Sequence, residues 1–199
     1  MRKAGRSSLT IALTAVVGLF LLSSVGGRAQ DKPRSEFFQA NAMGQSTQLG
    51  RTFSVNIIIE EYSTEEERQG LIEAFKSAKS NGDRARNLVN ALEKMHAKGR
   101  LAITGTIGYD IAYVKSFPTE TGRKIRIITN RPLRFGEVWA STRTTDYDLS
   151  AIELDISNDG KHTGILLPAC RFKLDKNKQL EITNYQNPWK LTNIRDRSD

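Results

Sequence analysis

The amino-acid sequence predicts an α+β domain with a helical hairpin inserted after the first strand of a mostly meandering, antiparallel sheet of about eight strands. Between residues 63 and 99, apolar residues recur every three to four positions, the spacing of amphipathic helices. After residue 99, short segments alternate apolar and polar residues between turn-forming residues, as antiparallel strands do. A sheet of this length curls into a barrel or splits into a sandwich, and the barrel is the preferred prediction.

The first predicted strand spans Phe53–Tyr62, where Val55, Ile57 and Ile59 share one face. Alternation of this kind indicates that one face of the strand is buried and the other is in contact with water. The strand is therefore expected to lie over the core of the domain.

Two helices are predicted next. Ser63 can cap the first, with Glu66 three residues on as its capping-box partner, and Asp83 can cap the second. The stripe of apolar residues predicts that each helix buries one face, and Gly99 ends the hairpin. The apolar residues of the two stripes are Leu71, Ile72, Phe75 and Ala78 in the first helix and Ala85, Leu88, Leu92 and Met95 in the second.

The remaining strands are short and separated by turns. Gly105 and Gly108 fall inside one strand pattern, where glycine usually marks a bulge or a bend, and Pro168 is expected to interrupt another. The predicted strands are Arg100–Tyr109, Ile111–Phe117, Arg123–Arg131, Phe135–Arg143, Leu149–Ser157, Thr163–Leu174, Gln179–Tyr185 and Trp189–Ile194.

The N-terminus predicts export. Residues 1–29 combine a basic start, an apolar run from Leu9 to Leu22 and a small-residue exit, the layout of a cleavable signal peptide. The run is shorter than the roughly 20 residues that a membrane-crossing helix needs, so cleavage between Ala29 and Gln30 is favoured over a permanent anchor. The expected location is periplasmic or extracellular, with no membrane span after cleavage.

After the signal peptide, residues 30–51 are polar and lack apolar periodicity, which predicts a flexible leader before a single, soluble α+β domain at 52–199. Cleavage removes four basic residues and no acid, so the formal charge of +8 falls to about +4. A charge this modest argues against a nucleic-acid partner.

Composition excludes several kinds of chemistry. His96 and His162 are the only histidines, and neither stands at a metal-ligand spacing, so no metal or other cofactor is predicted. No nucleophile elbow supports a serine hydrolase, and Cys170, in an apolar segment, is interpreted as a buried thiol. No catalytic residue is assigned.

The candidate binding residues are aromatic or basic. Trp139 alternates with polar neighbours and is the first choice, followed by Tyr109 and Tyr113. Arg126 belongs to a basic segment at residues 115–134 that could meet an anionic partner.

These observations favour a non-catalytic, exported binding or interaction protein whose partner is a small molecule or an anionic component of the cell envelope. Two alternatives stay open. One is a small secreted hydrolase or isomerase that uses carboxylate and tyrosine side chains. The other is a structural envelope protein.

Overall fold

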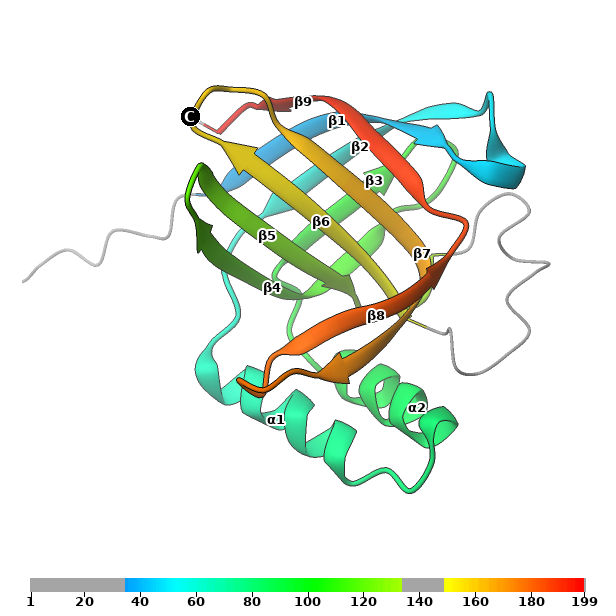
Figure 1. Cartoon of the computed structure of the whole chain (residues 1–199), viewed down its shortest axis with the longest axis vertical. Helices are drawn as coiled ribbons and strands as arrows, with labels where there is room; N and C mark the ends of the chain where they lie inside the picture. The colour runs from blue at the N-terminus through cyan, green and yellow to red at the C-terminus, as the bar shows by residue number, and fades with distance from the viewer. Residues whose placement is uncertain (1–34, 134–148, 199) are drawn as a thin grey trace, which may run out of the picture. The chain divides into compact units, whose positions relative to one another are not determined.

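The computed structural model describes residues 35–133 and 149–198, which contain nine antiparallel strands, two α-helices and one short 3-10 helix (Figure 1). The described part of the chain has no helix long and apolar enough to cross a membrane. The helices are α1 (Glu65–Lys76), α2 (Asn81–Leu92) and η1 (Ser46–Gln48), and the strands are β1 (Glu36–Gly44), β2 (Thr52–Ile59), β3 (Gly99–Ile103), β4 (Tyr109–Thr119), β5 (Gly122–Thr129), β6 (Leu149–Ser157), β7 (Thr163–Leu174), β8 (Leu180–Gln186) and β9 (Trp189–Asp196).

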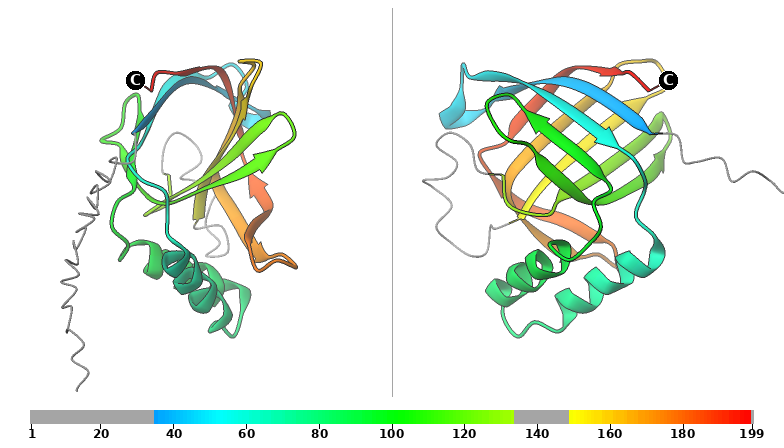
Figure 2. Two further views of the ribbon diagram at one scale, coloured as in Figure 1. Left: turned by 90° about the vertical axis from the view of Figure 1, so that its left-hand side faces the viewer. Right: turned by 180° about the vertical axis from the view of Figure 1, so that it is seen from behind.

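Eight of the strands close into a barrel. Strands β1 to β6 pair in chain order, β6 pairs with β7, the first half of β7 pairs with β9, and β9 returns to β1. Strand β8 stays outside this ring and pairs with the second half of β7, from Ala169 to Leu174. The result is a closed barrel from which a two-stranded ribbon, β7–β8, projects toward the helices (Figures 1 and 2).

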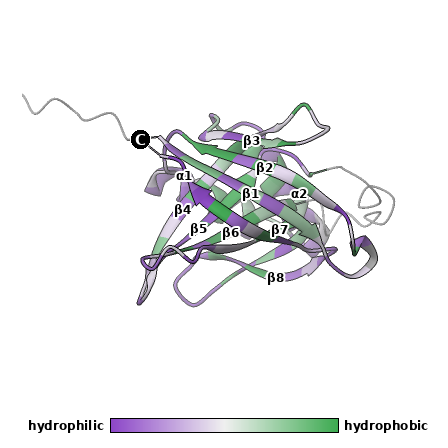
Figure 3. Cartoon of the chain, turned by 90° about the horizontal axis from the view of Figure 1, so that it is seen from above, coloured by the Kyte–Doolittle hydropathy of each residue, from purple (hydrophilic) through white to green (hydrophobic). Residues whose placement is uncertain are grey.

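The barrel interior holds the main apolar core. Alternate residues of each strand point inward, so hydrophobic and hydrophilic positions alternate along the strands (Figure 3). Trp189 and Phe38 are the largest fully buried side chains, and the ring of Phe53 packs 4.6 Å from that of Trp189. The alanines Ala40 and Ala42 leave room in β1 for these rings.

A second apolar core lies between the barrel and the helical pair. The buried stripe of the helices packs on outward-facing residues of β4 to β8. Strands β4, β6 and β7 bury both faces along part of their length, so they contain runs of consecutive buried residues instead of a clean alternation. The outward-facing residues are Ala112, Tyr113, Ile128, Leu149, Ala151, Leu167, Cys170, Phe172 and Leu180.

The first and last strands of the barrel lie side by side. In the antiparallel β1–β9 pair, Phe38 is opposite Asp196 and Gly44 is opposite Trp189. Just beyond the pair, the Arg197 amide donates to the Phe37 carbonyl at 2.7 Å and the Phe37 amide donates to Ser198 Oγ at 3.0 Å. The two ends of the barrel chain are therefore joined by hydrogen bonds at the same corner.

The α+β class, the antiparallel sheet, the barrel and the helical pair are confirmed, with several differences in detail. Residues 36–44, assigned from the sequence to a flexible leader, form β1, so the helical pair follows the second strand. In β1 the polar residues Gln39 and Asn41 alternate with the small inward residues Ala40 and Ala42, which hides the apolar period. The predicted strand Phe135–Arg143 lies outside the described residues.

The turn chemistry also differs from the prediction. Thr64, not Ser63, caps α1 and shares a capping box with Glu67, while Ser80 caps α2 in place of Asp83. Ser63 instead accepts a hydrogen bond from the Val114 amide at 3.0 Å. The observed cap lies one residue after the predicted cap in α1 and three residues before it in α2, and both residues of each pair are good cap formers, so local pattern alone could not choose between them.

Two interruptions were placed wrongly. Gly105 and Gly108, with φ near +80°, form the turn between β3 and β4 and do not bulge a single strand. Pro168, in contrast, lies within a continuous β7, and its carbonyl accepts a hydrogen bond from Ser150 Oγ. The register shift in the β6–β7 pair between Leu149 and Ala151 accommodates the proline.

Candidate ligand-binding groove

The start of α1 is fixed by a buried ion pair. Lys98, just before β3, has a side chain only 5% exposed, and its Nζ lies 2.6 Å from Glu61 Oε1 and 2.7 Å from Glu67 Oε1. Burial acts to lower the pKa of Lys98, but the hydrogen bonds that it donates to both carboxylates outweigh burial and raise the pKa. The lysine therefore stays charged and joins the segment before α1, the first turn of α1 and the segment before β3.

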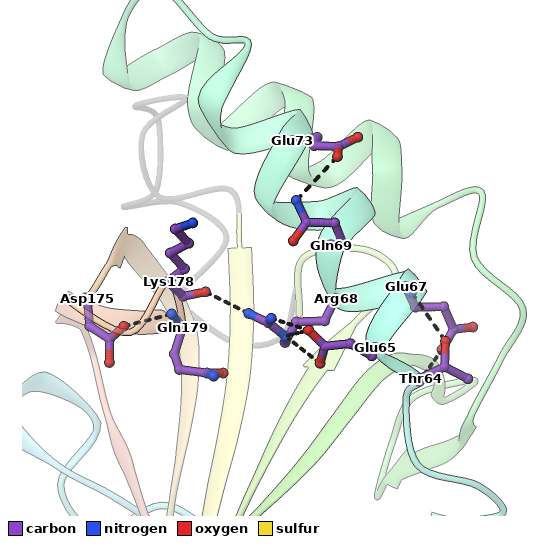
Figure 4. Close-up of polar contacts among 9 residues, drawn as sticks. All are labelled: Thr64, Glu65, Glu67, Arg68, Gln69, Glu73, Asp175, Lys178 and Gln179. Carbon is purple, nitrogen blue, oxygen red and sulfur yellow. Dashed lines mark hydrogen bonds and ion pairs between the residues drawn. The ribbon is translucent and has the colours of Figure 1, made fainter.

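A second contact joins α1 to the β7–β8 turn. Arg68 Nε donates to Glu65 Oε1 at 2.8 Å, and Arg68 Nη1 donates to the Lys178 carbonyl at 2.8 Å (Figure 4). The turn itself is closed by Asp175, which accepts from the Gln179 amide at 2.7 Å. The tip of the ribbon is thus held against the first half of α1.

Arg126 holds the ribbon from the barrel side. Its Nε donates to Glu153 Oε1 at 2.7 Å, and its Nη1 donates to the Leu180 carbonyl of β8. The guanidinium also lies 5.3 Å from the centroid of the Phe117 ring. These contacts position β8, so Arg126 acts as a structural clamp in this conformation.

Between the helical pair and the ribbon lies a groove of about 380 Å³, within the size range of small-molecule sites. Its floor is apolar, and the floor residues belong to the second core. They are Phe75 from α1, Ala85 and Leu88 from α2, Leu149 from β6, and Phe172 and Leu174 from β7.

The rim of the groove is cationic. Arg84 from α2 and Arg171 and Lys173 from β7 line it, together with the polar Asn81 and Thr183, and no carboxylate is among its lining residues in the described part of the chain. The combination of an apolar floor with cations at the rim suits a ligand that has an apolar body and a negative head.

The Arg84 side chain is held in place above the groove. Its Nη1 donates to Asn81 Oδ1 at 2.9 Å, and its guanidinium carbon lies 5.2 Å from the centroid of the Phe75 ring. A cation stacked on an aromatic face keeps most of its hydrogen-bond donors available. Arg84 is therefore oriented before a ligand arrives.

Lys173 makes only an exposed ion pair. Its Nζ lies 3.1 Å from Glu181 Oε2 on β8, and both side chains are about half exposed. A pair of this kind is worth little in water, so Lys173 can exchange its partner at small cost.

The two tyrosines chosen from the sequence do not line the groove. Tyr109 is buried in the barrel core, with Arg131 stacked 4.8 Å from its ring centroid. Tyr113 is buried in the second core, and burial raises its pKa to about 12. Both rings are buried among apolar neighbours, so neither reaches the groove in this structure.

The basic segment at residues 115–134 is largely neutralised by its neighbours. Arg123 forms a two-pronged pair with Glu36, at 3.0 and 2.8 Å, and Lys124 lies 3.6 Å from Asp155. The acids belong to other strands, so the sequence of this segment gave no sign of them. Trp139 and Arg134 lie outside the described residues.

The groove cations were missed in the sequence analysis because they are not clustered in the chain. Arg84 is one of two basic residues in α2, and its position becomes distinctive only when the ribbon brings Arg171 and Lys173 opposite it. The alternation of Arg171 and Lys173 with Phe172 and Leu174 was the available signal.

The carboxylates with shifted pKa values give no support to acid–base chemistry. Hydrogen bonds from Lys98 and Arg68 lower the pKa values of Glu61 and Glu65, and backbone hydrogen bonds lower those of Glu66 and Asp159. A general acid needs a raised pKa. In the described residues, no group of three His, Cys, Asp or Glu side chains is placed to hold a metal ion.

Comparison with known proteins adds no assignment, since no family model, curated protein or solved structure matches this chain. The groove is therefore interpreted from its own geometry.

Proposed function

We propose that the protein is a non-catalytic, exported binding protein that takes a small amphipathic anion into the groove between the helical pair and the β7–β8 ribbon. The observation that carries the proposal is the groove itself, which places three cationic side chains over an apolar floor. The apolar part of the ligand would lie on Phe75 and Phe172. Its carboxylate, sulfonate or phosphate would meet Arg84 and Lys173.

The exported location rests on the signal-peptide pattern of residues 1–29. In that compartment the anion would be a metabolite or a fragment of an envelope component. A binding protein for such a ligand needs an open groove, and the described residues that line this groove include no carboxylate to repel the anion.

The experiment uses 1-anilinonaphthalene-8-sulfonate, a fluorescent probe with an aromatic body and one sulfonate. We expect saturable one-site binding to the folded protein. The double variant R84Q/K173Q should bind at least about tenfold more weakly because the sulfonate loses both cations. Added salt at about 0.5 M should weaken wild-type binding, since the charges lie at the rim.

The matched control is R86Q, which removes one positive charge from an exposed position of the same helix. It should bind the probe as tightly as the wild type. Equal affinity of R84Q/K173Q and wild type would contradict the proposal, as would the absence of saturable binding.

A further inference from the structure

A second surface covers the outside of β2, β1 and β9, and it differs from the groove because it is neither apolar nor strongly cationic. We call it the amide face and define it by Gln39, Asn41, Ser54, Asn56, Asn193 and Arg195, which line a groove of about 300 Å³. Its lining contains one cation and no carboxylate, in a chain in which 26% of the residues are charged. The face is therefore polar but nearly uncharged.

The strand register aligns these side chains in two rows. Asn41 of β1 is opposite Ser54 of β2 and Thr192 of β9, and Gln39 is opposite Asn56 and Arg195. Directly opposed residues on one face have Cβ atoms about 5 Å apart, and successive rows lie about 7 Å apart along the strand. Polar side chains thus form two rows across three strands, with amides at Gln39, Asn41 and Asn56.

A β-bulge adds one more amide to these rows. Between Asn41 and Gln39, β9 carries one extra residue, and Asn193 adopts a left-handed conformation with φ of +50°. Its neighbours Leu191 and Ile194 are both buried, so the bulge turns Thr192 and Asn193 outward together. A bulge of this kind re-aims side chains.

The composition of the face runs against the usual preferences of strands. Asparagine is depleted in strands because its amide competes with the backbone for hydrogen bonds, and lysine, threonine or glutamate normally keep an exposed face soluble. In the part of the chain that the structure describes, the side chains of Gln39, Asn56 and Asn193 form no hydrogen bond within the protein. All three side chains line the groove.

The strip continues toward an exposed aromatic ring. One step beyond Asn41, Met43 is opposite Lys190, which lines a second hollow of about 390 Å³ with Gln45, Ser46 and Tyr185. Tyr185 is 47% exposed, a large exposure for an aromatic side chain. The exposed ring thus lines a hollow one row beyond the amides, where it offers stacking at the end of the strip.

We infer that the amide face binds an uncharged, polyhydroxylated chain, a neutral oligosaccharide or polysaccharide. A hydroxyl donates and accepts at the same atom, as an amide group does with its two ends, so rows of amides match a chain of hydroxyls. An anionic ligand would find one cation, Arg195, among the described residues that line this face. One sugar ring would stack on Tyr185, and the chain would extend along β1 and β9 over the amides.

The test uses isothermal titration of the full chain with three probes, maltohexaose, cellohexaose and chitohexaose. We expect at least one to bind with a Kd below about 1 mM, with little change in about 0.5 M salt. The variant N41A/N56A should weaken that binding about tenfold or more, and Y185A about threefold or more. The control N158A, at an exposed turn far along the chain, should bind as the wild type does.

A second variant guards against a folding defect. N193G removes the amide but suits the left-handed backbone at this position, so the fold should be kept while the sugar binds more weakly. R84Q/K173Q should leave sugar binding unchanged, which separates this site from the anion groove. Absence of binding by all three probes at about 10 mM, or wild-type affinity in N41A/N56A and N193G, would overturn the inference.

Discussion

Replacement of Lys98 by methionine tests whether the buried ion pair holds the helical pair on the barrel. The variant keeps the buried aliphatic stem and removes only the charge, leaving Glu61 and Glu67 facing each other without a cation. Breaking a fully buried pair costs about 3–5 kcal/mol. Because the side chains of Glu61 and Glu67 are 42% and 24% exposed, water screens part of this cost, and we expect about 2–3 kcal/mol.

The assay is urea unfolding followed by circular dichroism, with thermal unfolding as a check. The midpoint should fall at an unchanged slope, and Tm should drop by about 5–10 °C. The control K94M removes the same charge from an exposed position four residues earlier and should change the free energy of unfolding by less than about 0.5 kcal/mol.

The pH dependence gives a sharper form of the same prediction. The hydrogen bond from Lys98 lowers the pKa of Glu61, so this carboxylate stabilises the fold above its unfolded pKa of 4.5. That contribution is lost as the pH falls through the lowered folded pKa. K98M lacks it, so the difference between wild type and K98M should shrink between pH 7 and about pH 3. A difference that is small at pH 7, or that stays constant with pH, would refute the reasoning.

Three further predictions concern other parts of the chain. Cys170 is buried and donates to the Leu149 carbonyl at 3.3 Å, and burial raises the pKa of its thiol. A thiol reagent should therefore label Cys170 only after unfolding. Fast labelling of the folded protein would contradict this prediction. Gly99 has a φ of +151°, and a Cβ there would lie 2.0 Å from the Ile58 carbonyl oxygen. The variant G99A should therefore lower the free energy of unfolding, measured in urea, by about 3 kcal/mol. A cost under about 1 kcal/mol would show that the strands can separate locally. Mass spectrometry of the exported protein should show a chain that begins at Gln30; an intact Met1 would argue for an anchor or for no export.

The sequence predicted most of the fold because local patterns specify strands and helices independently of what they pack against. Val55, Ile57 and Ile59 all point into the barrel, and Leu71, Phe75 and Leu88 all face the second core. The strand β1 was missed because alternating alanine and polar residues do not produce a strong apolar period. Its burial depends on the rings of distant residues, which local sequence does not reveal.

The candidate sites could be predicted far less well, since each is assembled from separate parts of the chain. Arg126 was selected for its charge, yet its acid partner Glu153 lies opposite it on β6. The groove needs Arg84 to meet β7, and the amide face needs the β1–β9 pairing to bring Asn41 beside Thr192. Pairing between strands far apart in sequence is the information that a local pattern lacks.

The pairing of β1 with β9 determines how the barrel responds to a pulling force. In this antiparallel pair, Glu36 at the start of β1 and Asp196 at the end of β9 lie at the same corner. A load applied through both chain ends therefore acts on one hydrogen bond at a time and unzips the pair, whereas a load along the strands would strain all of the bonds together. Because this pair is one seam of the closed ring, a load applied through both of these strand ends would open the barrel along β1 and β9.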